Sequence, residues 1–168
     1  MSTSRRKKVI AMSTVNADID VEVPVSTAYN QWTQFESFPQ FLSGVDEVVQ
    51  LDDRNTHWKV SIAGVKREFD AEITEQIPDT RIAWTSTDGE AHAGVVTFHR
   101  LNPDESRISV RLDWEPEGAV ETIGSALQID DMQVAADLRK FKKLIESNGF
   151  ETGAWRGAID RDDDATGR

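Results

Sequence analysis

The 168-residue sequence contains no cysteine and no long hydrophobic segment. Without cysteine, the chain cannot form a disulfide framework, a thiolate nucleophile or a cysteine-ligated zinc or iron–sulfur site. No apolar run reaches the roughly 18 residues that a membrane-spanning helix needs. The basic cluster Arg5–Lys8 resembles the start of a signal peptide, but only Val9–Met12 follows it where a longer apolar segment is required. We therefore expect a cytoplasmic protein.

Several kinds of catalytic and cofactor-binding motif are also missing. The three histidines, His57, His92 and His99, do not have the spacing of a metal-binding pair on a helix or hairpin. The sequence has no nucleophile elbow, no glycine-rich phosphate loop and no dinucleotide-binding fingerprint. Acyl hydrolysis by such an elbow, nucleotide hydrolysis and Rossmann-type cofactor use are unsupported. We expect neither a metal nor a cofactor.

Acidic residues outnumber basic ones, giving a formal net charge of −11. Nucleic-acid binding depends mainly on neutralising phosphates, so this charge disfavours it, and it disfavours anionic membranes as well. We expect no nucleic-acid partner and no stable membrane insertion, while any protein partner stays unknown. Composition divides the chain into a disordered basic arm (1–13), one domain (14–159) and a disordered acidic tail (160–168).

A long amphipathic helix is predicted over Val120–Phe150. Acidic residues Asp130 and Asp131 suit its first turns, Arg139–Lys143 its last turns, and Gly149 its C-cap. Apolar residues recur near a spacing of 3.6 and form one stripe, which contains Leu127, Val134, Leu138, Phe141 and Ile145.

The preceding residues alternate between polar and apolar side chains, which is typical of strands. After a first strand ending near Pro24, we expect a helix over Thr27–Phe35 with Ser26 as N-cap, then a short helical piece over Phe38–Leu42. Turn sequences separate six further segments into an antiparallel meander. The predicted strands are Val15–Val23, Val45–Leu51, His57–Ile62, Val65–Gln76, Arg81–Ser86, His92–Leu101 and Arg107–Glu115.

The turns also predict the strand register. A two-residue turn at Ala63–Gly64 places Trp58 opposite Phe69 and Val60 opposite Arg67, and the turn at Pro78–Asp79 places Ile73 opposite Trp84. The same arithmetic at Asp88–Gly89 places Ala93 opposite Trp84. The inner face then collects mostly apolar residues, including Trp58, Val60, Phe69, Ile73, Trp84, Ile108, Val110, Leu112 and Trp114.

Arg67 falls on this apolar face, where an unpaired charge is costly. Strand curvature, or a structural carboxylate such as Glu47, would explain it; alternatively Arg67 is a polar anchor inside a ligand cavity. Ser86 shares its phase. His92 points inward if Gly94, Val96 and Phe98 do, but the turn arithmetic directs it outward.

Five tryptophans in so short a chain indicate either a bulky aromatic core or the wall of a cavity for a flat hydrophobic ligand. Trp58, Trp84 and Trp114 belong to three different strands, and Trp32 lies on the first predicted helix. That helix and the piece after it also carry Phe38 and Phe41, which suggests a lid or a plug on the sheet.

This order of elements is that of the helix-grip fold, an α+β architecture in which a curved antiparallel sheet of about seven strands wraps a long C-terminal helix. The sequence resembles the START-like (SRPBCC) superfamily, and within it the polyketide cyclase/dehydrase and lipid-transport family, which also holds coenzyme Q-binding proteins. The resemblance extends over roughly residues 15–148. The stretches that carry it are Val21–Leu42, His57–Ser86 with its PDTRIAW hairpin, Gly94–Leu101 and Arg107–Gly118.

The resemblance implies a cavity between sheet and helix that binds or carries lipids, quinones or polyketides. Trp58, Arg67, Phe69, Trp84, Ser86, His92 and Trp114 would line it, and Trp32, Phe38 and Phe41 would lie at its mouth. The segment Glu151–Gly157 (ETGAWRG) resembles a tail of bacterial members, and we expect Trp155 to pack back onto the domain.

Three hypotheses about function follow. We expect binding or transport of a small hydrophobic molecule without clear catalysis. One alternative is a polyketide cyclase/dehydrase with Arg67 as electrophilic anchor and His92 as base; the sequence shows no inward carboxylate for such an enzyme. The other is a protein-interaction module with a filled core.

Overall fold

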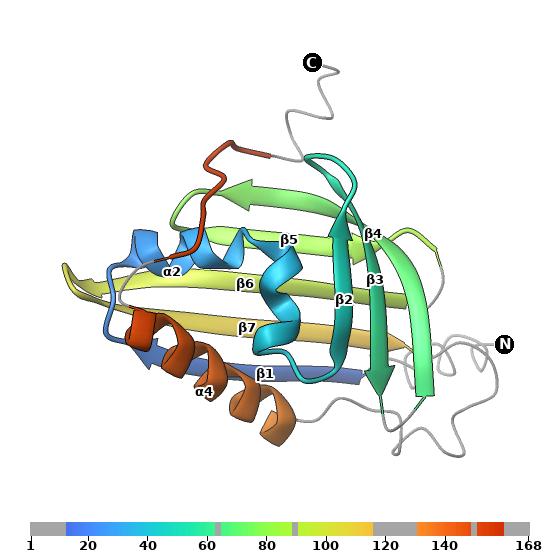
Figure 1. The fold of residues 1–168 in the computed structure, drawn as a ribbon, viewed down its shortest axis with the longest axis horizontal. Helices are drawn as coiled ribbons and strands as arrows, with labels where there is room; N and C mark the ends of the chain where they lie inside the picture. The colour runs from blue at the N-terminus through green and yellow to red at the C-terminus, as the bar shows by residue number, and fades with distance from the viewer. Residues whose placement is uncertain (1–12, 63–64, 89–90, 116–130, 149–150, 160–168) are drawn as a thin grey trace, which may run out of the picture.

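The structure, a computed structural model, describes residues 13–62, 65–88, 91–115, 131–148 and 151–159. The predicted tail (160–168) and all of the predicted basic arm (1–13) except Ser13 lie outside these residues. Within them the chain folds as predicted from sequence, into one curved antiparallel sheet with two short helices after the first strand and a long helix near the end (Figure 1).

Seven strands make up the sheet over the described ranges, in the order β1-β7-β6-β5-β4-β3-β2. Every neighbouring pair is antiparallel. The first strand, β1, pairs with the last one, β7. The strands are β1 (Ser13–Val21), β2 (Val45–Gln50), β3 (Asn55–Ile62), β4 (Val65–Ile77), β5 (Arg81–Ser86), β6 (Ala91–Asn102) and β7 (Glu105–Glu115).

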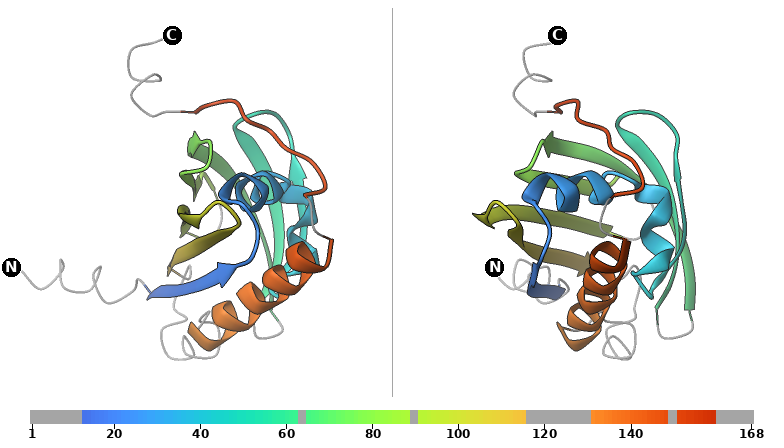
Figure 2. Two further views of the ribbon diagram at one scale, coloured as in Figure 1. Left: turned by 90° about the vertical axis from the view of Figure 1, so that its left-hand side faces the viewer. Right: turned by 60° about the vertical axis from the view of Figure 1, so that its left-hand side comes forward.

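The helices lie on the concave face of this sheet. Figure 2 shows the sheet curling around α4 (Asp131–Asn148), while α2 (Val25–Trp32) and the 3₁₀ helix η1 (Phe35–Gln40) cover other parts of the same face. Helix α4 contacts β1, η1 contacts β2, and α2 contacts β6 and β7. The apolar side of every element is therefore directed into one interior.

Helix α4 buries the predicted stripe. Val134, Leu138, Phe141 and Ile145 are all at most 4% exposed. The predicted helical residues before 131, including Leu127, lie outside the described part of the chain, and so does Gly149. The charge prediction for the C-terminal end was wrong. The last turn holds no basic residue, because even Lys143 lies more than one turn before the end of the helix at Asn148.

The two short helices begin earlier than predicted. Pro24 occupies the N-cap of α2, with φ −59° and ψ 152°, and no side chain caps the helix. The φ of proline is already suited to a helix start, so Ser26 lies inside the first turn and the predicted cap was wrong. The second piece is the 3₁₀ helix over Phe35–Gln40 rather than a helix over Phe38–Leu42.

An aromatic cluster fixes these helices to α4. The Trp32 ring centroid lies 5.3 Å from that of Phe38 and 5.1 Å from that of Phe41, both edge-to-face. Phe41 in turn lies 5.1 Å from Phe141 of α4. Such pairs each stabilise by about 0.5–1.5 kcal/mol beyond burial, so the segment predicted as a lid or a plug is packed firmly into the core.

The strand register agrees with two of the three predicted turns. Trp58 pairs with Phe69, Val60 with Arg67 and Ile73 with Trp84. Between β5 and β6, however, Trp84 pairs with Gly94, not with Ala93. This shift of one residue turns His92 inward, where it is 8% exposed.

The segment 151–159 returns along α2 and ends beside β4. Gln31, which is fully buried, accepts a hydrogen bond from the Thr152 N–H at 2.9 Å and donates one to the Thr152 hydroxyl at 3.0 Å. Ile159 forms a two-way backbone bridge with Gln76 of β4. Trp155 packs against the core as expected.

Candidate functional site

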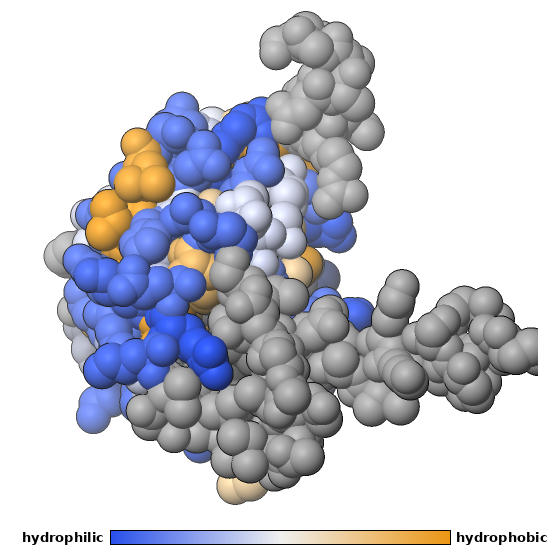
Figure 3. Space-filling view, turned by 90° about the vertical axis from the view of Figure 1, so that its right-hand side faces the viewer, coloured by the Kyte–Doolittle hydropathy of each residue, from blue (hydrophilic) through white to orange (hydrophobic). Residues whose placement is uncertain are grey.

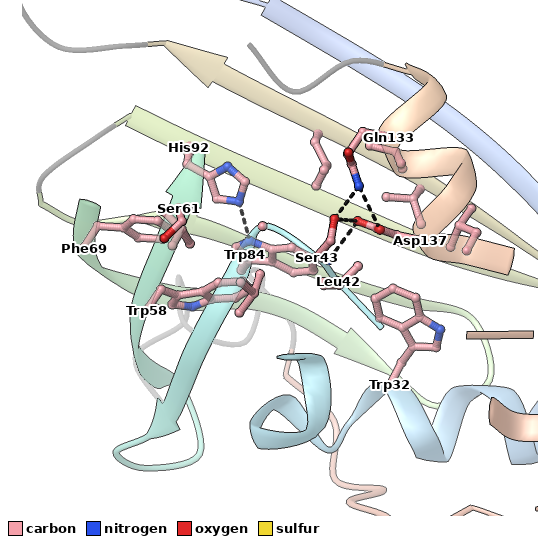
Figure 4. Close-up of a pocket in the computed structure, with 17 residues that line it drawn as sticks. Trp32, Leu42, Ser43, Trp58, Ser61, Phe69, Trp84, His92, Gln133 and Asp137 are labelled. Atoms are coloured by element: carbon pink, nitrogen blue, oxygen red, sulfur yellow. Dashed lines mark hydrogen bonds between the residues drawn. The ribbon is translucent and has the colours of Figure 1, made fainter. Parts of the chain in front are cut away.

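A cavity of about 280 Å³ lies between the inner face of the sheet and α4 (Figure 4). Its wall includes an aromatic part on β3–β6 and a polar part between the η1–β2 connection and α4. The residues lining it are Trp32, Leu42, Ser43, Gly44, Val45, Trp58, Val60, Ser61, Phe69, Trp84, His92, Val110, Leu112, Gln133, Val134, Asp137 and Leu138.

Three rings from adjacent strands form the aromatic wall. The Trp58 ring lies between Phe69, at 5.7 Å and 15°, and Trp84, at 5.6 Å and 25°. The Trp58 indole N–H donates to Thr56 Oγ1 at 2.8 Å, so the polar atom of this ring is satisfied within its own strand. This part of the cavity wall is therefore aromatic and apolar.

His92 completes this wall as a neutral imidazole. The Trp84 indole N–H donates to His92 Nε2 at 3.1 Å, and because that nitrogen accepts, the ring proton of the neutral form lies on Nδ1. Burial lowers the pKa of His92 to about 4. The backbone N–H of His92 donates to Ser86 Oγ at 3.0 Å, which positions the strand without bringing Ser86 into the cavity lining.

The polar part centres on the Asp137 carboxylate. Asp137 is 5% exposed and accepts hydrogen bonds from the Ser43 N–H at 3.1 Å and the Ser43 hydroxyl at 3.3 Å. Gln133 Nε2, one turn earlier on α4, donates to Asp137 Oδ1 at 3.1 Å and also to Ser43 Oγ. The helix and the η1–β2 connection are thus joined through this carboxylate.

The structure brings together some of the residues predicted for the site. Trp58, Phe69, Trp84, His92 and Trp32 line the cavity. Phe38 and Phe41 are almost fully buried in the aromatic cluster behind Trp32 and do not line it. The side chain of Trp114 lies outside the described part of the structure.

Arg67 is half-buried and is not among the residues that line the cavity. Glu47, considered above as its partner, forms an ion pair with Lys59 at 3.4 Å. The charged group in the lining is Asp137. Its charge is negative, whereas the sequence led us to expect the positive charge of Arg67.

Sequence reasoning missed Asp137, Ser43 and Gln133. Asp137 lies three residues after Val134 and four before Phe141, which places it on the apolar stripe of α4. A carboxylate inside a stripe of buried residues is itself a signal, because it needs partners to be buried. Ser43 follows the second helical piece and offers no comparable pattern.

Few large hydrophobic side chains of the described residues are exposed to solvent. Figure 3 shows mainly hydrophilic residues on one face, with small hydrophobic patches. Large hydrophobic residues exposed within the described ranges are Leu51 between β2 and β3, Leu101 in β6 and Met132 in α4. Over the same ranges, no helix combines the length and the apolar character needed to cross a membrane, and no three side chains form a metal-binding group.

Fold and cavity together define a START-like helix-grip protein, and the comparisons with known proteins agree. Residues 21–143 match the family described as polyketide cyclase/dehydrase and lipid transport. The chain belongs to this family. Its family and fold are those of hydrophobic-ligand-binding or polyketide-cyclase-like proteins.

Individual relatives support this assignment. The chain is 56% identical over 149 residues to an uncharacterized 17.2 kDa protein of the melC2-rnhH intergenic region of Streptomyces lincolnensis, covering 88% of this chain and 99% of that one. DR_A0006 from Deinococcus radiodurans has a similar structure, with a TM-score of 0.67, 24% identity and coverage of 82% of this chain and 99% of its own. The Zhui aromatase/cyclase from a Streptomyces species has a TM-score of 0.56 and 13% identity, with coverage of 82% and 87%. The two structures show the shared fold.

Proposed function

We propose that this protein binds a small, flat hydrophobic molecule in the cavity between sheet and α4. The observation that carries the proposal is the cavity itself. Its 280 Å³ equals the liquid volume of roughly nine water molecules, whereas packed protein cores leave few voids larger than one. It is close to the lower end, about 300 Å³, of the range for small-molecule pockets. Such a space argues against the filled core that the interaction-module hypothesis requires.

The chemistry of the wall supports a flat ligand. Trp58, Trp84 and Phe69 line the cavity, and aromatic rings pack favourably against further rings in offset-stacked or edge-to-face arrangements. The indole N–H groups of Trp58 and Trp84 donate to Thr56 and His92. A ligand at this end of the cavity therefore does not need to accept a hydrogen bond from either of them. An apolar ring system therefore suits this part of the cavity.

The test is to fill the cavity from one strand. Val110, in the lining and 6% exposed, is replaced by Phe, and the exposed neighbour Arg111 is replaced by Phe as matched control. Naphthalene is titrated while tryptophan fluorescence is followed, since tryptophans line the cavity. We expect saturable quenching in the wild type and in Arg111→Phe, and its loss in Val110→Phe. Absence of quenching in the wild type, or equal quenching in all three proteins, would overturn the proposal.

Native mass spectrometry of the freshly purified protein then addresses the natural ligand. A discrete adduct that leaves on denaturation would identify the ligand class directly. The Val110→Phe protein should lack this adduct if the ligand occupies the cavity.

A second candidate function is a polyketide cyclase/dehydrase, favoured by one observation. The cavity lining holds both a buried carboxylate, Asp137, and a neutral imidazole, His92, and these two side-chain types are common general acids and bases. The expected role of Arg67 as electrophilic anchor does not suit a residue outside the lining. Ring closure of a linear poly-β-ketone thioester should then be accelerated by the wild type and lost in His92→Gln. Binding of the thioester without acceleration would exclude the enzyme hypothesis.

A further inference from the structure

The charge of the cavity lining restricts what can bind there. Asp137 is the charged side chain among the described lining residues, which include no lysine or arginine. His92 also contributes no positive charge near neutral pH, because its pKa is about 4. Lys140 Nζ is 3.9 Å from Asp137 Oδ1, but its side chain is 54% exposed and it is not in the lining. The lining of the cavity therefore carries a negative charge at Asp137 and no positive charge.

The hydrogen-bonding capacity of the polar end points the same way. The N–H and hydroxyl of Ser43 both donate to Asp137, and Gln133 Nε2 donates to Asp137 and to Ser43. These donors are already directed at acceptors within the cluster. A carboxylate has about four acceptor positions, and these contacts use three of those on Asp137. At this end of the cavity, the Asp137 carboxylate can therefore accept one further hydrogen bond from a ligand.

The position of the cluster fixes the orientation of a ligand. Ser43 and Gln133 are exposed and Asp137 beneath them is buried, so the polar end lies at the rim of the cavity. Figure 4 shows Phe69, Trp58 and His92 at the other side, with Trp84 between them and Ser43. An elongated molecule would place its rings against the aromatic wall and its polar head at Asp137.

We propose that the cavity selects ligands whose head group donates a hydrogen bond to Asp137, a hydroxyl or a protonated amine, and rejects ligands that carry a carboxylate. The inference rests on the proposed binding function and names its ligand class. A carboxylate head would bring a second negative charge next to Asp137 and lose its hydration without a positive side chain in the lining. A hydroxyl on the same ring system satisfies an acceptor that is already in place.

The experiment compares four naphthalenes that differ only in the head group. Wild-type protein is titrated with naphthalene, 2-methoxynaphthalene, 2-naphthol and 2-naphthoate near neutral pH, by calorimetry or tryptophan fluorescence. Hydrogen bonds to charged groups correspond to roughly tenfold or more in affinity. We expect 2-naphthol to bind at least about tenfold more tightly than 2-methoxynaphthalene, and 2-naphthoate to bind most weakly of the four.

Asp137→Asn tests whether this carboxylate is the cause. The amide keeps an acceptor but removes the charge, so the preference for 2-naphthol over 2-naphthoate should fall by about tenfold or more. Asp20→Asn is the matched control, because it removes the same charge from a half-exposed carboxylate on β1 that pairs with Arg107. It should leave the preference unchanged.

Each outcome bears on one of the two proposals. If no naphthalene binds the wild type, the proposed function itself fails. If all four bind with similar affinity, or if 2-naphthoate binds best, the function stands and the selectivity for donors is wrong. An unchanged preference in Asp137→Asn likewise contradicts it. The wild-type series decides the matter even if Asp137→Asn does not fold.

Discussion

The indole of Trp84 lies directly against the backbone of Gly94, its partner across β5 and β6. A Cβ added to Gly94 would be 2.6 Å from Trp84 Cε2, a distance that real Cβ atoms do not show. Only glycine lets this ring lie flat on the sheet, donate to His92 and form the wall of the cavity.

Replacing Gly94 by Ala should therefore destabilise the protein, by about 1–3 kcal/mol, because Trp84 has to move within a packed core. Gly44→Ala is the matched control. Its Cβ would meet the Ser61 carbonyl oxygen at 3.4 Å, an ordinary contact, so its stability should change little or rise. Urea unfolding measures both variants, and equal free energies of unfolding would contradict the role given to Gly94.

His92 predicts a loss of stability in acid. Burial lowers its pKa from 6.5 to about 4, so between these values the unfolded chain binds a proton that the folded protein does not. Unfolding therefore becomes more favourable as the pH falls from about 6.5 to 4, by about 3 kcal/mol in total.

His92→Gln keeps an acceptor for the Trp84 N–H but cannot titrate. The free energy of unfolding of the wild type should fall relative to that of His92→Gln over this pH interval, as followed by urea titrations at several pH values. Parallel curves for the two proteins would show that His92 is not buried in its neutral form.

His57 predicts the opposite pH dependence on the outer face of the sheet. Hydrogen bonds to Asp70 at 2.6 Å and Glu68 at 2.9 Å raise its pKa above 6.5. The stabilisation is complete below pH 6.5 and is lost as the pH rises through the folded pKa. These groups are partly exposed, so the effect stays below about 1 kcal/mol.

The measurement is the difference in unfolding free energy between the wild type and His57→Gln. It should be larger at pH 6 than at pH 9, and high salt should reduce it. A difference that grows with pH would refute the charge pairing.

The C-terminal segment predicts a truncation effect. Ending the chain after residue 150 removes the buried Ile159 and Thr152, which exchanges two hydrogen bonds with Gln31. It also removes Arg156, which donates to Asn30 at 2.7 Å and pairs with Asp79 at 2.9 Å. We expect a loss of about 2–5 kcal/mol from the exposed apolar surface and the broken hydrogen bonds.

Ending the chain after Ile159 is the control, because every one of these contacts remains. Its melting temperature should match that of the full chain. If the shorter truncation is equally stable, the segment contributes nothing to the fold.

The sequence allowed most of the architecture to be predicted, because strands and helices leave periodic patterns. The hairpin that pairs Trp58 with Phe69 follows from alternation and one short turn. The turn predicted at Asp88–Gly89 shows the limit of this reasoning. A register shift of one residue at Trp84 reverses the direction of His92, and its steric cause, Gly94 beneath an indole, is a contact between two strands rather than a local pattern.

The polar residues of the site were harder to predict for a similar reason. Arg67 has the phase of an inner residue but does not reach the cavity lining, whereas Asp137 lies on the apolar stripe of α4 and does. Periodicity assigns a residue to a face but does not give its distance from the cavity. Ser43 joins the site through its contacts with Asp137 and Gln133 of α4, which are 94 and 90 residues away in the chain.

The C-terminal segment also bears on how the chain folds during its synthesis. Gln31 of α2 bonds to Thr152, 121 residues later, and Val15 of β1 pairs with Leu112 of β7. A ribosome adds about 5–20 residues per second. The partners of β1 and α2 are therefore synthesised on the order of ten seconds after these two elements. The hairpins from β2 to β6 can pair in the meantime. The beginning of the polypeptide is thus among the last parts to reach its native place.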